Sequence, residues 1–414
     1  MQSPWSGSTK IVESLLSHPD IDVNARGTGG YFKERSALVM AIEYSNHDVV
    51  RLLLDHPDTE VRIDAQYGDA LMTAIHGPRP EALKMLVKHG KVDINKGWQI
   101  GSPLYVALAS QISSHDRDAP FKMVKAAEIV QTLLSHPHIN VNHGKGDLTP
   151  LMAAVERQNV EAVWQLVAHP KVDVNACRED GVTPLIYAAS SNEEILDILL
   201  DHPGILINKR DKTGKSALLL AADKGYVAQV KKMLRNPAKI DVNAQEFEKQ
   251  KSPLFQAALN GNDEIITELL KHPSISVNDA ASTFLLIVKG EEYNLNATSL
   301  TAAAHNGHDK SVKALLSHPL VDVNCGWSGV PPLVAAAQEG HVNAAKMLLD
   351  HRCTDPSIKR ADNVSALYLA SKNGHGKVVS LFLKYDKVDV NQPSLSVEEG
   401  PLIVASRNMV ARWL

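Results

Sequence analysis

Residues 169–189 have the sequence HPKVDVNACREDGVTPLIYAA, and this pattern returns in register along almost the whole chain. The leucine of the Thr-Pro-Leu step marks each copy: Leu38, Leu71, Leu104, Leu151, Leu185, Leu218, Leu254, Leu300, Leu333, Leu367 and Leu402. Eight of the ten intervals between these leucines span 33 to 36 residues, and the other two span 46 and 47. This period predicts small supersecondary units that stack on their neighbours.

Each copy carries signals for two short helices and an extended segment. The Thr183–Pro184 step predicts the start of the first helix, because proline there loses no hydrogen bond and threonine caps free amides. An alanine three residues after the leucine recurs in all eleven copies, as at Ala188, which indicates closely packed helices. A second amphipathic helix follows, as in 195–200, and the Val-Asp-Val-Asn alternation predicts an extended finger.

Helix, turn, helix and finger within about 33 residues resemble the ankyrin repeat over essentially the full chain. The resemblance implies a mostly α-helical solenoid over residues 1–414, in which about 10–11 units with β-hairpin fingers stack into one superhelix. The linker form is similar to that of fungal ankyrin arrays. Where the family usually has histidine after the leucine, this chain has Met152, Ile186, Leu219 or Phe255, so we expect packing to replace a hydrogen bond.

The two long intervals predict insertions. The first lies near residues 111–125, and we expect a lengthened second helix over 121–134. The second lies at 280–297, where an apolar run, a turn and an alternating segment predict an elongated β-hairpin, either self-packed or a contact arm.

The two ends of the array carry apolar residues where a solenoid needs polar caps, namely Ile11, Leu15, Met409 and Trp413. We therefore expect both ends to be uncapped, with flanking domains of a longer chain or another partner to cover them.

Composition excludes several classes of protein. A net charge of -4 argues against a general nucleic-acid or membrane-surface protein, and no stretch is apolar for the length of a membrane span. Cys177, Cys325 and Cys353 are odd in number and unpaired in spacing, which favours reduced thiols. We expect a cytoplasmic protein, with the nucleus as the open alternative.

No sequence motif supports catalysis, a cofactor or a metal. Residues 214–216 read GKS but lack the first glycine of a phosphate-binding loop, and HExxH and GxSxG are absent. Seven histidines precede proline at the end of the second helix, where the imidazole can meet free helix carbonyls: His18, His56, His136, His169, His202, His272 and His318. Their spacing of roughly 10 Å between stacked helices is too wide for one zinc ion.

An asparagine recurs in the turn after Val-Asp-Val and is expected to bond backbone groups of the finger. In related ankyrin proteins this asparagine can be hydroxylated, which the resemblance permits at Asn175, Asn243 and Asn324.

The resemblance also implies where a protein partner would bind, because finger tips and the ends of the first helices line one concave face in ankyrin arrays. The tips carry Tyr67, Trp98, Phe247 and Trp327, which either contact a partner or fold back on their own fingers. The helix positions include Arg157, His305, Asn306, Gln338 and Glu339.

Residues 209–239 hold nine Lys or Arg against two Asp. Helical spacing places Lys209, Arg210, Lys212, Lys215 and Lys224 on the tip and concave side, and Lys231, Lys232 and Arg235 on the outer helix. The first group favours attraction of an acidic peptide.

These observations predict a non-catalytic scaffold that holds a protein or peptide partner along the concave face. The alternative is a targeting or sensor arm of a larger signalling protein or enzyme, whose catalytic domain lies outside this chain. Direct nucleic-acid binding through residues 209–239 is disfavoured by the acidic remainder of the chain.

Overall fold

The computed structural model describes residues 6–29, 35–61, 69–97, 99–109, 119–235, 238–288, 291–325, 330–360, 363–393 and 399–411. The chain divides into two compact units, residues 1–179 with 201–205, and residues 180–200 with 206–414. The single array over residues 1–414 stays a prediction, because each unit is compact by itself.

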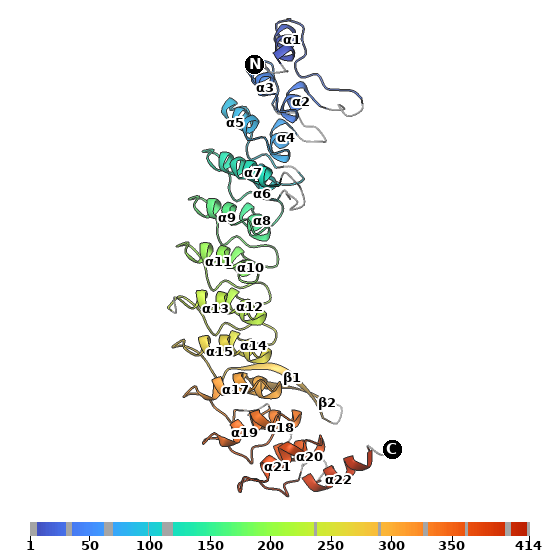
Figure 1. Ribbon diagram of the computed structural model, residues 1–414, viewed down its shortest axis with the longest axis vertical. Coiled ribbons are helices and arrows are strands. Elements are labelled where there is room, and N and C mark those ends of the chain that lie inside the picture. Colours follow the sequence, from blue (N-terminus) through green and yellow to red (C-terminus); the bar gives the residue numbers. More distant parts are fainter. Residues whose placement is uncertain are drawn as a thin grey trace. The chain divides into compact units, whose positions relative to one another are not determined.

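Short helices dominate both units (Figure 1). The first unit contains α1 (Ser6–Leu16), α2 (Ala37–Glu43), α3 (His47–Asp55), α4 (Ala70–His76), α5 (Pro80–His89), α6 (Pro103–Ala109), α7 (Ala119–Leu134), α8 (Pro150–Glu156) and α9 (Val160–Val167). The second contains α10 (Pro184–Ala188), α11 (Glu193–Leu200), α12 (Ala217–Lys224), α13 (Val227–Met233), α14 (Pro253–Asn260), α15 (Asp263–Leu269), β1 (Ala280–Val288), β2 (Glu291–Thr298), α16 (Ser299–His305), α17 (Asp309–Leu316), α18 (Pro332–Glu339), α19 (Val342–Asp350), α20 (Ala366–Lys372), α21 (Gly376–Phe382) and α22 (Pro401–Ala411).

From α2 to α21 consecutive helices of the described chain pair into repeats, with the even-numbered helix first and the odd-numbered helix second. Within each unit, first helices contact the first helices of neighbouring repeats, and second helices contact second helices. The predicted helical repeat solenoid is confirmed by this arrangement.

Side chains cap the starts of many first helices, as predicted. The side-chain oxygen of Thr183 accepts the backbone N–H of Ile186 at 3.2 Å, and Thr149 accepts that of Met152 at 3.2 Å. Serine takes this role before α2, α12, α14 and α20. The Thr-Pro or Ser step therefore fixes where these repeats begin, whereas Asp69 caps α4 and α18 has no side-chain cap.

Close packing of the first helices depends on the recurrent alanine. Ala154 and Ala257 are fully buried, whereas Ala107 beside the first insertion is half-buried. Met152 and Phe255 are buried at the position where the family usually has histidine. Apolar packing thus fills that position, as predicted.

In many repeats the turn after the second helix is bonded to the next repeat through asparagine. Asn243 Nδ2 donates to the Ser274 carbonyl at 2.7 Å, and Asn243 Oδ1 accepts the Ser276 N–H at 2.9 Å. The same pair of bonds is made by Asn24, Asn95, Asn142, Asn208, Asn278 and Asn324. The asparagines therefore link repeats as well as shaping their own turns.

The seven His-Pro histidines bond the backbone of the turn, where bonds to helix carbonyls were expected. His169 Nδ1 accepts the Lys171 N–H at 3.2 Å, and the other six accept the N–H two residues further on. The helix carbonyl of Leu166 already accepts the His169 backbone N–H at 3.0 Å. The imidazole therefore serves the turn instead of the helix end.

The interval of 46 residues contains the hairpin of β1 and β2. The strands are antiparallel, with pairs from Ala280–Thr298 to Val288–Glu291 and an irregularity between Ser282 and Phe284. The interval of 47 residues contains α7, the longest helix among the described residues.

At the two ends, described apolar side chains are exposed. Leu402 of α22 is 80% exposed, and Ile11 and Leu15 of α1 are also exposed.

Candidate functional site

Of the four predicted tip aromatics, only Phe247 lies within the described residues; Tyr67, Trp98 and Trp327 lie outside them. Phe247 is 63% exposed. Its N–H donates to the Thr213 carbonyl of the preceding finger at 2.9 Å. A Cβ on Gly214, which has a φ of +88°, would be only 2.8 Å from the Phe247 ring. The ring thus packs on the neighbouring finger and leaves most of its surface to solvent.

Five lysines lie on the same two fingers as Phe247 or at the end of α12. Lys212 and Lys224 are exposed, and Lys215 is half-buried. Two further lysines, Lys249 and Lys251, lie two and four residues after Phe247 and were not among the residues predicted from the sequence. Within the described chain, the side chains of these five lysines form no ion pair or hydrogen bond. We call Lys212, Lys215, Lys224, Phe247, Lys249 and Lys251 the lysine–Phe247 surface.

A small polar cavity opens within this surface. Its volume is about 130 Å³, and it is lined by Lys215, Leu219, Asp223, Glu246, Lys251 and Gln256. Gln256 Nε2 donates to Asp223 Oδ1 at 2.7 Å, which leaves the two ammonium groups and Glu246 available. The cavity has room for one small polar group of a partner.

The other predicted basic residues of the finger have partners inside the protein. Arg210 Nη2 pairs with Asp241 Oδ2 at 3.2 Å, and Nη1 donates to the Gln245 carbonyl at 3.4 Å. Lys209 also has a partner. These two cations contribute to the fold of the finger.

The basic residues of α13 form ion pairs with neighbouring second helices. Lys232 Nζ pairs with Glu193 at 3.0 Å and also with Asp197, and Lys231 lies 3.9 Å from Glu268. Burial alone would lower the pKa of Lys232, but its hydrogen bonds to Asp197 and Glu193 raise it. This half of the basic cluster therefore ties repeats together.

The candidate residues at the ends of first helices in the second unit also have partners inside the protein. Asn306 Nδ2 donates to the Leu259 carbonyl at 3.2 Å, and Arg360 donates to Gln338 Oε1 at 3.0 Å. His305 Nδ1 lies 3.8 Å from Glu339 Oε1. Burial lowers the pKa of His305, Glu339 partly offsets this effect, and nearby His341 adds to it.

Three histidines that were not predicted from the sequence also bond the ends of these first helices. His308, His341 and His375 each bond the carbonyl near the end of the preceding first helix, at Leu259 (3.1 Å), His305 (2.9 Å) and Gln338 (2.9 Å). The available signal was the Gly-His pair at 307–308, 340–341 and 374–375.

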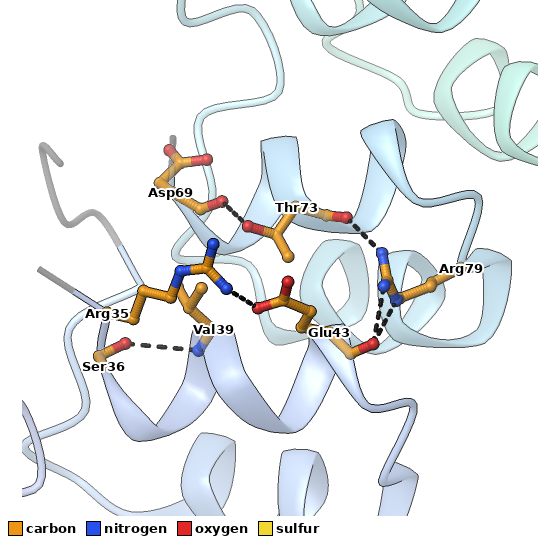
Figure 2. A network of polar contacts seen from close by, with 7 residues as sticks. All are labelled: Arg35, Ser36, Val39, Glu43, Asp69, Thr73 and Arg79. Carbon is orange, nitrogen blue, oxygen red and sulfur yellow. Dashed lines mark hydrogen bonds and ion pairs between the residues drawn. The ribbon is translucent and has the colours of Figure 1, made fainter. Parts of the chain in front are cut away.

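In the first unit, arginine takes this role (Figure 2). Arg79 Nη2 donates to the Glu43 carbonyl at 2.7 Å, and Arg79 Nη1 donates to the Thr73 carbonyl at 3.1 Å. Glu43 itself pairs with Arg35. Polar residues at helix ends are thus used for contacts between repeats in both units.

Arg157 is exposed in the first unit, at the rim of a larger cavity. This cavity has a volume of about 580 Å³ and is lined mainly by apolar residues of α6, α7 and α9, among them Leu108, Val124, Val130 and Ala162. At its rim Gln165 Nε2 donates to Glu161 at 2.8 Å.

The three asparagines considered for hydroxylation are held in tight turns. Asn175 Nδ2 donates to the Gly204 carbonyl at 2.8 Å, and Asn324 Nδ2 donates to the Cys353 carbonyl at 2.6 Å. The Nδ2 and Oδ1 atoms of Asn243 both form hydrogen bonds to the next repeat. Their modification stays a prediction.

Across the described ranges no group of His, Cys, Asp or Glu has the arrangement of a metal site. No described helix combines the length and the apolar character needed to cross a membrane.

A family model described as ankyrin repeats in three copies matches residues 1–97, 122–211, 206–281 and 275–360, so the chain belongs to the ankyrin repeat family. A comparison with curated proteins found no match. Ankyrin repeats generally mediate protein–protein interactions, and domains built from them are typically non-catalytic.

Proposed function

We propose that this protein is a non-catalytic scaffold that binds a protein or peptide partner through the lysine–Phe247 surface, and that the bound segment is acidic. The observation that carries the proposal is the group of five unpaired lysines around an exposed aromatic ring. Aromatic anchors contribute much of the energy at interfaces, and complementary charge adds specificity and a faster association.

The surface suits a peptide better than a duplex nucleic acid. Asp223 and Glu246 line the small cavity together with Lys215 and Lys251, so both signs of charge occur in one small space. A uniform phosphate backbone would meet these carboxylates, whereas a peptide can place its own polar groups between them. Phe247 adds an apolar contact that a phosphate backbone does not use.

The remaining candidates of the concave face belong to the proposal on sequence grounds. Trp327 in the second unit, and Tyr67, Trp98 and Arg157 in the first, are proposed as further contact residues, each within its own unit. Cys177, Cys325 and Cys353 are free thiols, which supports a reducing compartment such as the cytoplasm.

The test is a random peptide library displayed on phage and selected against the full chain. We expect enriched peptides that contain Asp or Glu beside an apolar residue. Their affinity should fall roughly tenfold or more in Lys212→Glu/Lys215→Glu and in Phe247→Ala. It should also fall as the salt concentration rises.

The matched control is Lys313→Glu/Lys346→Glu, which makes the same charge change at exposed positions of α17 and α19. If the control weakens binding as much as the surface variant, net charge and not the proposed surface governs the interaction. If a labelled DNA duplex competes fully with the peptides, the surface is a nucleic-acid site and the proposal is wrong.

A further inference from the structure

The hairpin of β1 and β2 differs from the other fingers of the described chain. Those fingers contain at most isolated bridges, such as Arg26–Ser36, Arg210–Ser216 and Lys359–Ser365. The hairpin has eight residue pairs, and Figure 1 shows it as a long ribbon between the helices labelled α14 and α17. A two-stranded ribbon of this length is only marginally stable in water by itself.

The base of the hairpin is fixed in the core. Ala281 of β1 and Ala297 of β2 are buried and pack in one cluster with Phe255 of α14 and Ala302 of α16. The ribbon therefore has a defined origin, and its distal part is presented in a defined direction.

The edge of β1 that faces away from β2 is the distinctive feature. At its start the Ser282 N–H donates to the Lys249 carbonyl of the preceding finger at 3.0 Å. Beyond that bond, the described residues include no third strand of this sheet. Alternate backbone N–H and C=O groups of an edge strand are left unpaired and are a template for another strand.

The composition of β1 leaves this edge unprotected. Proteins usually guard an exposed edge with charge or proline, but residues 281–288 (ASTFLLIV) contain neither. The other strand differs, because β2 begins with Glu291 and Glu292. Pairing is therefore favoured at β1 and disfavoured at the start of β2.

We propose that the outer edge of β1 pairs with β1 of a second copy of this chain, which forms a two-fold symmetric dimer with a continuous four-stranded sheet. A two-fold axis makes the two β1 strands antiparallel, so each contributes the same apolar residues 284–288. The pairing is closed, because a two-fold axis uses the outer edge of β1 once from each copy.

Charge complementarity supports a second copy as the occupant. In the antiparallel arrangement the tip of one hairpin lies beside the base of the other. The described residues next to the tip include Glu291 and Glu292, which begin β2. In the two fingers before the base, the unpaired lysines Lys212, Lys215, Lys249 and Lys251 outnumber Asp211, Glu246 and Glu248. Lys249 stands at the start of the free edge, where the acidic tip of the partner would arrive.

Sedimentation velocity of the full chain over a range of concentrations tests the proposal. We expect a dimer. Leu286→Lys places a charge in β1 and should give a monomer, while the control Asn294→Lys places the same charge in β2 and should leave the dimer intact. Circular dichroism confirms that each variant remains folded.

A charge-swap experiment tests the orientation and does not depend on edge variants. Glu291→Lys/Glu292→Lys and Lys249→Glu/Lys251→Glu should each raise the dimer dissociation constant by roughly tenfold. An equimolar mixture of the two should recover the parent value, because each tip then meets a base of opposite charge.

Three outcomes would overturn the inference: a parent chain that is monomeric throughout, a dimer that survives Leu286→Lys, or a mixture without recovery. Growth beyond a dimer would show open-ended pairing and would also overturn it. Peptide binding at Lys212, Lys215 and Phe247 can persist in each case, so the proposed scaffold function is tested separately.

Discussion

The asparagine bonds between repeats predict a measurable loss of stability in Asn243→Ala. The Asn243 amide donates to the Ser274 carbonyl at 2.7 Å and accepts the Ser276 N–H at 2.9 Å, so alanine removes two hydrogen bonds between neighbouring repeats. A hydrogen bond contributes a net 0.5–1.5 kcal/mol, about 1–3 kcal/mol for two. Because Ser274 is exposed and water can replace part of the loss, we expect about 1–2 kcal/mol.

Native-state hydrogen exchange is the suitable assay, because a repeat array need not unfold in one step. A loss of this size raises the local opening constant roughly 5- to 30-fold. The faster exchange should be confined to peptides from the two repeats that Asn243 joins, since each repeat contacts only its neighbours.

Asn391→Ala is the matched control. Asn391 occupies the same turn position, and its N–H donates to Asp389 Oδ1 at 3.0 Å, as the Asn243 N–H does to Asp241 at 3.2 Å. Within the described residues its side-chain amide bonds to no other repeat. Equal effects of the two substitutions, or no effect of Asn243→Ala, would refute the assignment of this amide as a link between repeats.

Three other predictions concern stability. Gly340→Ala should destabilise the fold more than Gly374→Ala, because both glycines have positive φ but only at Gly340 would the new Cβ meet a side chain, His375 Nδ1 at 2.6 Å. Denaturant titration compares the free energies of unfolding of the two variants. Equal losses of free energy would mean that the His375 ring moves aside freely. Phe255→Ala should cost about 3–5 kcal/mol and speed proteolysis of the hairpin, because Phe255 packs on its base; an unchanged cleavage rate would argue against that support. Burial and the hydrogen bond to Asp350 raise the pKa of Tyr385 to about 12 from 10.0. The stabilisation of the fold by this interaction is therefore present below pH 10.0 and is lost as the pH rises towards 12. A spectroscopic titration should show a phenol that ionises near pH 12 in the parent, and this phenol should be absent in Tyr385→Phe.

Much of the local structure followed from the sequence because it depends on residues close together in the chain. The Thr183 cap needs only the N–H three residues on, and the packing of Ala154 follows from its place in the period. The hairpin was also predicted, since the apolar run at 284–288, the turn and the alternation are adjacent. Such patterns fix backbone conformation before any tertiary contact forms.

The candidate site could be predicted only in part. Lys212 and Lys215 were identified by charge, but so was Arg210, which pairs with Asp241 in the next repeat. Lys251 was not predicted, because its importance comes from lining a cavity with Lys215 of the finger one repeat earlier.

The sequence by itself determined that the chain is an array of ankyrin repeats and where each repeat begins, since those features repeat along one dimension. Only the tertiary structure decided which polar side chains bond to other repeats and which are left for a partner. Lys232 and Asp197, or Asn306 and Leu259, are one or more repeats apart, and they meet because the stacking offset and side-chain conformations bring them within bonding distance. A hydrogen bond is lost within a fraction of an ångström, so the period of the sequence cannot specify it.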